Sequence, residues 1–544
     1  MPKGVFQNPL WHYHLRDMTL IRELPSKPLI ALFIFLATTA LYLFTLAPSI
    51  TLQHFGSDSG ELTASAYTLG VAHPPGYPTY LLLAKVFSLV IPWGDVAHRI
   101  NVLSAVSGAG AVVMVYYICH LLIGRISRAA EAIGGVSASA AASVAAASLA
   151  FSSLLWSQSV IAEVYSLNAI FTGGIVLLVL RWSNDPGAGF RPLAAAGFLM
   201  GLGLGNHLTL VFLALPVTYV MVLHRRKLTP VLIAKLLGAL IIGLSVYIYL
   251  PIRASATPPI NWGNAANLEG FLWTVSAVPY RGLLFGLPLA ELPGRLIEWA
   301  YVLVRQFNAI GLLLGILGVW RLRVSKLPML VFTALLFLPY FAYSITYHSS
   351  DAQVYLIPTF MVFAIWIGVG LHWLVKLVAE TLTPRLREIV VLPAALFLVA
   401  FLAVPGLHLL MNYGDINLRD DTESLTYAQG IFQVVESDAL ILADAEHELF
   451  PLWYYGFVME GGRGPTVIST RLTQFDWYLR GQNKSYPDVV PAHVVGAYTN
   501  RLIQIVEFNL EVRPVYITSE ADFLLSHFEG REEDNLYRLL SRKT

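Results

Sequence analysis

The chain has 544 residues, of which 56% are hydrophobic and only 13% are charged, and its formal net charge is +1. Soluble domains carry about 25% charged residues, so one soluble core cannot hide this much apolar surface and a lipid bilayer must cover it. The near-zero charge indicates no nucleic-acid partner, and the single cysteine, Cys119, excludes an intramolecular disulfide.

The first element is a membrane anchor. Basic residues at Lys3, Arg16, Arg22 and Lys27 precede the apolar run 28–47. This run is as long as a spanning helix needs and longer than the apolar part of a usual signal peptide, so we expect it to be retained.

Ten further apolar segments follow, giving about eleven predicted transmembrane helices. The fifth and sixth are short and meet at Gly205-Asn206-His207, so they also fit a helical hairpin that only dips into the membrane. The segments are 28–47, 99–122, 134–155, 163–181, 192–207, 208–223, 229–251, 299–319, 328–346, 356–377 and 389–411.

Basic residues in the connecting loops predict the orientation. Lys and Arg cluster in alternate loops, as at 225–227 and 321–326, whereas the loops 156–162 and 347–355 contain none. By the positive-inside rule, the N-terminal segment 1–27 is cytoplasmic and the loops 48–98 and 252–298 are external. The lone cysteine and compact loops favour a prokaryotic cell membrane.

An odd number of crossings places the tail, 412–544, outside as well. Charges return there, and the apolar runs shorten to strand length at 439–442, 466–469 and 515–518. Helical patterns lie between them at 446–459 and 497–509. We therefore predict an all-α polytopic membrane domain over 28–411 and a small extracytoplasmic α/β domain over 412–544.

The first external loop holds an unusual set of ionisable residues. Asp58 lies just before the first of two expected short helices, 60–71 and 79–91, and Glu61 lies in its first turn. His73 lies in the Pro/Gly turn between them, and Pro78 opens the second helix. Two interpretations of Asp58 and Glu61 fit their spacing, a helix capping box and acid–base catalysis. His73 taken alone fits a polar turn residue better than a functional one.

Two runs in this loop identify a family resemblance. Asp58-Ser59-Gly60-Glu61 and Leu69-Gly70-Val71-Ala72-His73-Pro74-Pro75-Gly76-Tyr77-Pro78 resemble GT-C-type membrane glycosyltransferases of a family once catalogued as a domain of unknown function. That family includes the animal transmembrane O-mannosyltransferase acting on plexin-type domains. Similar stretches follow in the expected order at 156–158, 162–168, 203–207, 249–253, 261–263, Asp351 and 354–356.

The resemblance implies that a sugar, mannose by analogy with the animal relative, moves from a polyprenyl-phosphate donor to an acceptor hydroxyl on the external face. The resemblance leaves three acceptors open: a protein Ser/Thr, a glycan or a lipid. In such enzymes an acidic residue of the first external loop typically acts as the base, a role that maps onto Asp58, with Glu61 as the alternative. Displacement assisted by one carboxylate inverts the anomeric centre.

Other candidates would hold the substrate. Arg253, just beyond the seventh segment, is expected to bind the departing phosphate, with His73 or Arg281 assisting. Simpler roles also fit: boundary residues snorkel or cap helices, and tryptophans sit in interfacial belts. The substrate-binding candidates are His73, Tyr77, Glu163, His207, Arg253, Asn261, Trp262 and Asp351.

No metal cofactor is expected. Asp58 with Glu61 is the alternative site for a divalent cation, because some GT-C enzymes need one, although those resembling mannosyltransferases usually do not. In the tail, Asp444-Ala445-Glu446-His447-Glu448 mixes metal-ligand types, but neighbouring residues at a helix start diverge and acidic residues suit a helix N-terminus.

The alternative function is that of a transporter or flippase for a lipid-linked or small polar substrate, and a receptor or scaffold is a third. A transporter would place ionisable residues at mid-membrane and interrupt paired helices. Here the apolar segments are nearly free of central charges, and the acidic residues lie in external loops.

Overall fold

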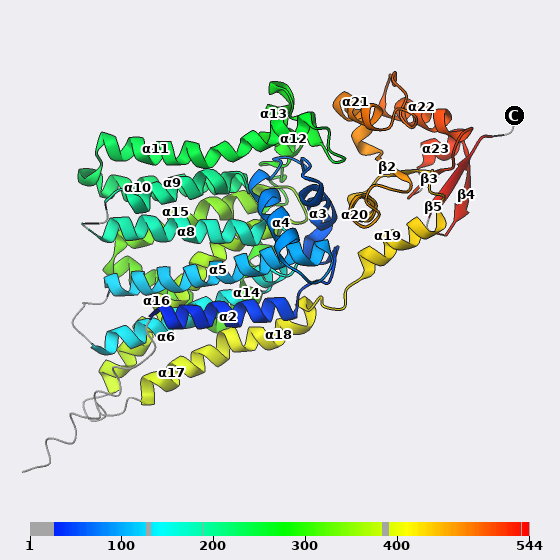
Figure 1. Cartoon of the computed structure of the whole chain (residues 1–544). Helices are drawn as coiled ribbons and strands as arrows, with labels where there is room; N and C mark the ends of the chain where they lie inside the picture. Colours follow the sequence, from blue (N-terminus) through cyan, green and yellow to red (C-terminus); the bar gives the residue numbers. More distant parts are fainter. Residues whose placement is uncertain are drawn as a thin grey trace, which may run out of the picture.

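The computed structural model describes residues 27–126, 132–185, 187, 189–382, 391–519, 521–534 and 536–542. All but the last residue of the N-terminal segment 1–27 lies outside this part of the chain. Long helices run side by side in a bundle, and a small sheet domain caps one end of it (Figure 1).

The eleven segments expected to span the membrane are all helical. Eight helices among the described residues are long and apolar enough to cross a bilayer, and the remaining three expected segments are shorter apolar helices, α6, α9 and α10. The protein is therefore a multi-pass membrane protein. The bundle helices are α2 (Lys27–Phe44), α5 (Val96–Ile126), α6 (Ala132–Ala150), α8 (Tyr165–Asn184), α9 (Arg191–Leu204), α10 (Ala214–Leu223), α11 (Pro230–Leu244), α14 (Leu292–Ser325), α15 (Leu327–Thr346), α16 (Ile357–Leu382), α17 (Val391–Phe401) and α18 (Leu407–Ile416).

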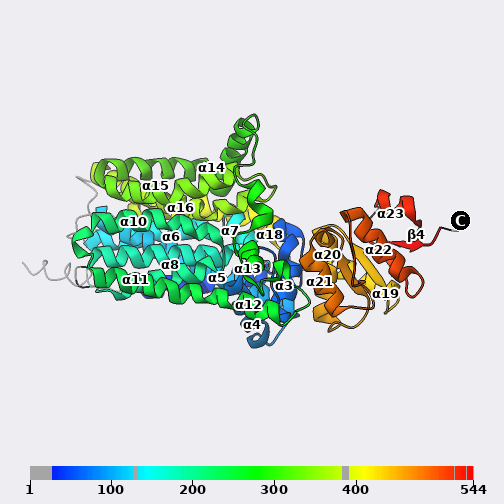
Figure 2. The same cartoon turned by 90° about the horizontal axis from the view of Figure 1, so that it is seen from above.

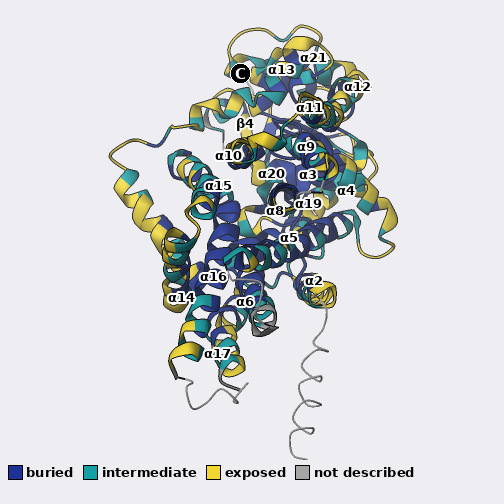
Figure 3. Cartoon of the chain, turned by 90° about the vertical axis from the view of Figure 1, so that its left-hand side faces the viewer, coloured by how far each residue is buried: buried dark blue, intermediate teal, exposed yellow. Residues whose placement is uncertain are grey.

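Burial divides these helices into an inner and an outer set. Most of the apolar window of α5 (83%) and α16 (94%) is buried inside the protein, compared with 17% of α2, and Figure 3 shows the same contrast. Helices apolar all round need either protein or lipid on every side, so the exposed faces of the outer set are lipid-facing. Small residues allow close approach inside the bundle: a β-carbon at Gly370 of α16 would lie 2.0 Å from the Leu314 carbonyl of α14.

Short elements connect the helices at the end of the bundle that bears the sheet domain. Figures 1 and 2 place α3, α4, α12 and α13 there, so the loops expected on one side of the membrane do share one end. These elements are η3 (Gln53–Asp58), α3 (Ser59–Thr68), α4 (Pro78–Val90), α7 (Ser153–Gln158), η4 (Leu208–Leu213), α12 (Tyr249–Ser255), η7 (Trp262–Asn264), α13 (Leu268–Val275), η8 (Val278–Leu283) and η9 (Ala352–Leu356).

The tail folds as the expected α/β domain. Its five-stranded sheet has the order β2-β1-β3-β5-β4, in which β1 (Leu440–Ala443) pairs in parallel with β2 (Thr466–Ser469) and β3 (Val515–Ile517). These are the three strands expected from the apolar runs. Its helices are α19 (Glu423–Val434), α20 (Glu446–Tyr454), α21 (Asp476–Ser485), α22 (Tyr498–Leu510) and α23 (Asp522–His527).

The antiparallel hairpin of β4 (Glu529–Glu533) and β5 (Leu536–Leu540) was not expected. Strand β4 reads Glu-Gly-Arg-Glu-Glu and is the exposed edge of the sheet. Charged edge strands lack the apolar alternation by which a strand is recognised, because neither face needs burial.

Candidate active site

The N-terminus of α3 presents Asp58. Asp58 is the N-cap residue, but its side chain makes no capping hydrogen bond, and Glu61 turns to His73 instead. The capping-box interpretation of this pair is therefore wrong. The Asp58 side chain remains 29% exposed, which leaves a carboxylate accessible from the end of the bundle.

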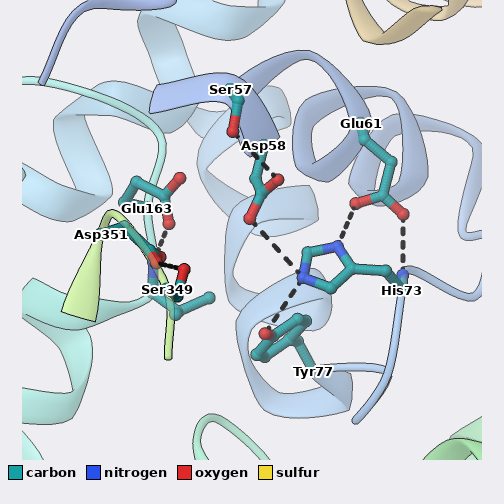
Figure 4. Close-up of polar contacts among 9 residues, drawn as sticks. Ser57, Asp58, Glu61, His73, Tyr77, Glu163, Ser349 and Asp351 are labelled. Atoms are coloured by element: carbon teal, nitrogen blue, oxygen red, sulfur yellow. Dashed lines mark hydrogen bonds and ion pairs between the residues drawn. The ribbon is translucent and has the colours of Figure 1, made fainter. Parts of the chain in front are cut away.

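Glu61 fixes His73 through two hydrogen bonds. The Glu61 carboxylate is fully buried. Its Oε1 accepts from the backbone N–H of His73 (2.8 Å), and its Oε2 accepts from the ring Nδ1–H of His73 (2.7 Å). The turn after His73 is possible because Gly76 takes a positive φ of 89° while its N–H donates to the His73 carbonyl. The ring of His73 is thus held at a set position, with Nε2 pointing away from Glu61 (Figure 4).

His73 and Asp58 face one another. His73 Nε2 lies 3.6 Å from Asp58 Oδ2. Burial alone would lower the pKa of His73, but the charges of Glu61 and Asp58 outweigh it and raise that pKa to about 10. Burial raises the pKa of Asp58 to about 7, against the opposing charge of His73 and with added repulsion from Glu446 and Glu61. At neutral pH this arrangement gives an imidazolium next to a carboxyl group poised to gain or lose a proton.

Tyr77 contacts His73, and His207 packs against Tyr77. The hydroxyl of Tyr77 lies 3.1 Å from His73 Nε2, and the Tyr77 ring stacks on His207 at 6.4 Å between centroids. His207 Nδ1 accepts the backbone N–H of Thr209. Burial and the nearby charge of His73 lower the pKa of His207 to about 4, so its ring is neutral. The site thus contains one charged and one neutral histidine.

Glu163 and Asp351 add two acidic side chains on the other side of Asp58 (Figure 4). Glu163 is 2% exposed, and its Oε1 has no hydrogen-bond partner among the described residues. Desolvation, with the charges of Asp58 and Asp351 adding to it, raises the pKa of Glu163 well above its usual range, which favours its protonated form. Asp351 accepts from the Ser349 hydroxyl.

Trp262 and Asn261 close the site from the second large loop. Val71 and Asn261 form a short parallel bridge. The backbone N–H of Trp262 donates to the Val71 carbonyl across it (3.1 Å). This bridge brings the Trp262 ring to 6.2 Å from the His73 ring. Two loops 190 residues apart in sequence thereby lie against each other beside His73.

Arg253 does not join this group. Its guanidinium donates to the carbonyls of Leu69 (2.7 Å) and Thr68 (3.4 Å), at the C-terminal end of α3. Ten residues of helix separate that end from Asp58, about 15 Å at the usual rise. The structure therefore does not bring Arg253 together with Asp58, and phosphate binding by Arg253 stays a prediction. In the position observed, a basic side chain at a helix C-terminus stabilises unpaired carbonyls and the helix dipole.

Two contributors were missed by sequence reasoning. The Tyr280 ring of η8 lies 6.1 Å from the His73 ring, and Glu446 of the tail is close enough to raise the pKa of Asp58. The one sequence feature that drew attention to Glu446 was the acidic run 444–448, considered there as a metal-ligand set or a helix N-terminus. Within that run, Glu448 takes the capping role by accepting the Ala445 N–H.

No group of three or more His, Cys, Asp or Glu among the described residues is arranged to hold a metal ion.

Comparisons with known proteins agree with the family resemblance. Residues 58–231 match the family model described as the protein O-mannosyl-transferase TMEM260 N-terminal domain. A mouse (Mus musculus) protein named protein O-mannosyl-transferase TMEM260 is 29% identical over 480 residues, covering 84% of this chain and 64% of the mouse protein. Its namesake in Dictyostelium discoideum is 24% identical over 543 residues, covering 89% and 63%. The chain therefore spans less than two thirds of these relatives' length.

The fold is shared with a solved membrane protein. ArnT from Cupriavidus metallidurans bound to undecaprenyl phosphate superposes with a TM-score of 0.55 at 13% identity, covering 94% of this chain and 97% of that one. The apo state of the same protein superposes with a TM-score of 0.57 at 12% sequence identity, covering 93% of this chain and 97% of that one. The expected GT-C architecture and the resemblance to the O-mannosyltransferase family are both confirmed.

Proposed function

We propose that this chain is a membrane glycosyltransferase that moves a hexose, mannose, from a polyprenyl-phosphate carrier to an acceptor hydroxyl, and that Asp58 is the catalytic base. The observation that carries the proposal is the Asp58–His73–Glu61 arrangement, an accessible carboxylate 3.6 Å from a buried imidazolium. A general base works best with a pKa near the operating pH, and that of Asp58 is about 7.

The reaction is a single displacement. Asp58 takes the proton of the acceptor hydroxyl while the hydroxyl oxygen attacks the anomeric carbon of the donor sugar. The bond between that carbon and the phosphate oxygen breaks, and the phosphate leaves with the electron pair. Attack opposite the leaving group inverts the anomeric centre, with no sugar bound covalently to the protein.

In this proposal the other residues of the site bind the phosphate and the sugar of the donor. The His73 imidazolium stabilises the negative charge on the departing phosphate. Arg281, next to Tyr280 in η8, is the second candidate for that role. Glu163 and Asp351 bind sugar hydroxyls. The ArnT structure holds undecaprenyl phosphate, which supports a polyprenyl-phosphate donor here. No metal is required in this scheme.

The active-site end faces away from the cytoplasm in this proposal. Basic residues concentrate in the loops at the opposite end, as at Arg225-Arg226-Lys227, and such residues stay on the cytoplasmic side. The N-terminus is then cytoplasmic, the tail domain extracytoplasmic, and the lone cysteine favours a prokaryotic cell membrane. The relatives named as protein O-mannosyltransferases support a protein Ser/Thr as the acceptor.

The test is transfer by detergent-purified protein from radiolabelled undecaprenyl-phosphate mannose, without any transmembrane gradient. Asp58→Asn is expected to reduce the rate about 10²–10⁴-fold, because the base is lost, whereas Asp185→Asn at the other end of the bundle keeps it. An unchanged rate in Asp58→Asn removes Asp58 from the mechanism. A wild-type protein that carries the lipid across vesicles but transfers no sugar would instead be a flippase.

A further inference from the structure

A cavity lies at the end of the bundle opposite the active site. Its volume is about 370 Å³, within the range of about 300–1,000 Å³ that is usual for small-molecule sites. It is lined by the end of α8, by residues 189–190 before α9, by η5 (Arg225–Lys227) and by the first turns of α11. Figure 1 shows these ends of α8, α9 and α11 on the side of the bundle far from the sheet domain.

Lys227 and Lys235 bring two ammonium groups to the cavity from different elements. Lys227 Nζ donates to carbonyl oxygens in the last turn of α8, at 3.3 Å for that of Ser183. Asp185 is the acidic residue of the described lining, and its Oδ1 accepts the N–H of Gly187. Two ammonium groups and one carboxylate leave the described lining with a surplus of one positive charge.

Lys235 belongs to a helical span that is otherwise strongly apolar. The span Pro230–Ser255 has a mean hydropathy of 2.3, and 11% of it is buried inside the protein, so α11 faces lipid. Side chains of a helix tilt toward its N-terminus, and Lys235 reaches back to Phe190, with Nζ 3.8 Å from the ring centroid. In the described part of the chain, no carboxylate or carbonyl oxygen accepts from this ammonium group. A charge in a membrane span without such a partner is costly and indicates a site for an anion.

The N-terminus of α11 adds to the positive potential of the cavity. Thr229 is its N-cap residue and lines the cavity, and its side chain accepts the N–H of Leu232. The helix dipole places partial positive charge at this end, where anions are favoured. Arg225 and Arg226, both exposed, precede Lys227 in η5. The charges at this end of the bundle therefore attract an anion to the cavity.

The apolar part of the lining favours a lipid over a soluble anion. Val231 lines the cavity and is 62% exposed, so the cavity opens beside the lipid-facing surface of α11. The rings of Trp182 and Phe190 also line it, and aromatic rings gather at the depth of lipid headgroups. A molecule with an anionic head and an apolar tail matches both parts of the lining, whereas a free anion matches only one.

We propose that this cavity binds the headgroup of an anionic phospholipid, with Lys227 and Lys235 contacting its phosphodiester and its acyl chains lying along Val231. The single negative charge of a phosphodiester matches the surplus positive charge of the lining. The orientation proposed above places this end of the bundle in the cytoplasmic leaflet, where basic pockets between transmembrane helices bind anionic headgroups. This lipid site does not depend on the glycosyltransferase function, because its residues lie at the opposite end from Asp58.

The test measures lipid binding to the detergent-purified full chain by native mass spectrometry, with phosphatidylglycerol and phosphatidylcholine added in equal amounts. Lys235→Gln removes the ammonium group, and Lys235→Arg keeps the charge. Lys326→Gln is the matched control, because Lys326 is exposed and lies outside the cavity at the start of α15. Arg125 contacts both Ser183 of α8 and Met329 of α15, which places Lys326 at the same end of the bundle.

We expect the wild type to prefer phosphatidylglycerol to phosphatidylcholine, and Lys235→Gln to bind phosphatidylglycerol about fivefold or more weakly. Lys235→Arg and Lys326→Gln should bind it as the wild type does. Phosphatidylglycerol should also raise the thermal midpoint of the wild type more than that of Lys235→Gln, because a ligand stabilises the state that binds it. The midpoints without added lipid report whether each variant is folded.

Three results would overturn the assignment. Equal binding of the two lipids by the wild type would show that the cavity does not select an anionic headgroup. Wild-type affinity for phosphatidylglycerol in Lys235→Gln would show that the lipid binds elsewhere. Displacement of phosphatidylglycerol by millimolar inorganic phosphate would identify a pocket for a soluble anion.

Discussion

A β-carbon added at Gly60 would lie 2.6 Å from the carbonyl oxygen of Phe450. This contact joins the N-terminal turn of α3, which carries Asp58 and Glu61, to α20 of the tail domain. Only glycine permits so close an approach of two backbones. The tail domain therefore rests directly on the catalytic turn, and α20 brings Glu446 near Asp58.

Gly60→Ala tests this contact. The two backbones must move apart by several tenths of an ångström, and overpacking of this kind costs about 1–3 kcal/mol. We expect a lower midpoint of thermal inactivation in detergent together with a reduced transfer rate, since Asp58 moves with the turn. Gly430→Ala, where the added carbon meets open space, should leave both unchanged. A fully active and stable Gly60→Ala protein would show that the tail does not position α3.

The pH dependence of transfer follows from Asp58 and His73. The base must be ionised, and the pKa of Asp58 is raised to about 7, so below that pH the rate falls about tenfold per pH unit. The imidazolium must be protonated, and the pKa of His73 is raised to about 10, so the rate falls again above pH 10. A plateau between these limits is expected in rates measured at saturating donor.

Glu61→Gln distinguishes the two limbs of that profile. Removing the charge of Glu61 takes away the largest interaction that raises the pKa of His73, so the alkaline limb should move down by about 1–3 units. The acid limb, set by Asp58, should move much less. A profile in which both limbs stay in place would mean that His73 does not carry the required positive charge.

Glu163 gives a contrasting pair of substitutions. Burial and the charges of Asp58 and Asp351 raise the pKa of Glu163 well above its usual range, which favours its protonated form, and glutamine resembles a protonated carboxyl group in shape and hydrogen bonding. Glu163→Gln should therefore retain the rate within about fivefold, whereas Glu163→Ala loses about tenfold or more with the hydrogen bonds to the sugar. Steady-state transfer rates at pH 7 compare the two; equal, severe losses would indicate an ionised Glu163.

Arg253→Ala tests the helix-capping role. Its guanidinium stabilises the C-terminal carbonyls of α3 at Thr68 and Leu69, so its loss should lower the thermal midpoint by an amount corresponding to about 1–3 kcal/mol. The donor KM should stay near the wild-type value. A large rise in donor KM without loss of stability would restore Arg253 as a phosphate ligand.

Much of the fold was predictable from local patterns. Each of the eleven apolar segments became a helix, and the first-loop helices expected at 60–71 and 79–91 are α3 (Ser59–Thr68) and α4 (Pro78–Val90). In the tail, the apolar runs predicted β1, β2 and β3. The hairpin of β4 and β5 escaped prediction because its exposed edge is charged and has no apolar alternation.

The composition of the candidate site was partly predictable, but its geometry was not. Asp58 and Glu61 were recognised from spacing and resemblance, yet the same spacing fitted a capping box equally well. The structure separates the two, because Glu61 binds a histidine twelve residues away instead of the backbone of its own helix. The contacts of Arg253 with the end of α3 were not predicted, because its position in the sequence gives its depth in the membrane but not its neighbours.

The sequence by itself determined that the protein is a multi-pass membrane protein, and it determined where helices and connecting loops alternate along the chain. The reason is that in lipid every backbone polar group must be paired within the chain, and long apolar helices achieve this. Tertiary structure alone decided which side chains share the site: Glu163 with Asp351, His73 with Trp262, and Glu446 of the tail with Asp58. The physical reason is that pKa values and contacts depend on burial and on charges contributed by distant elements, which no local pattern of residues records.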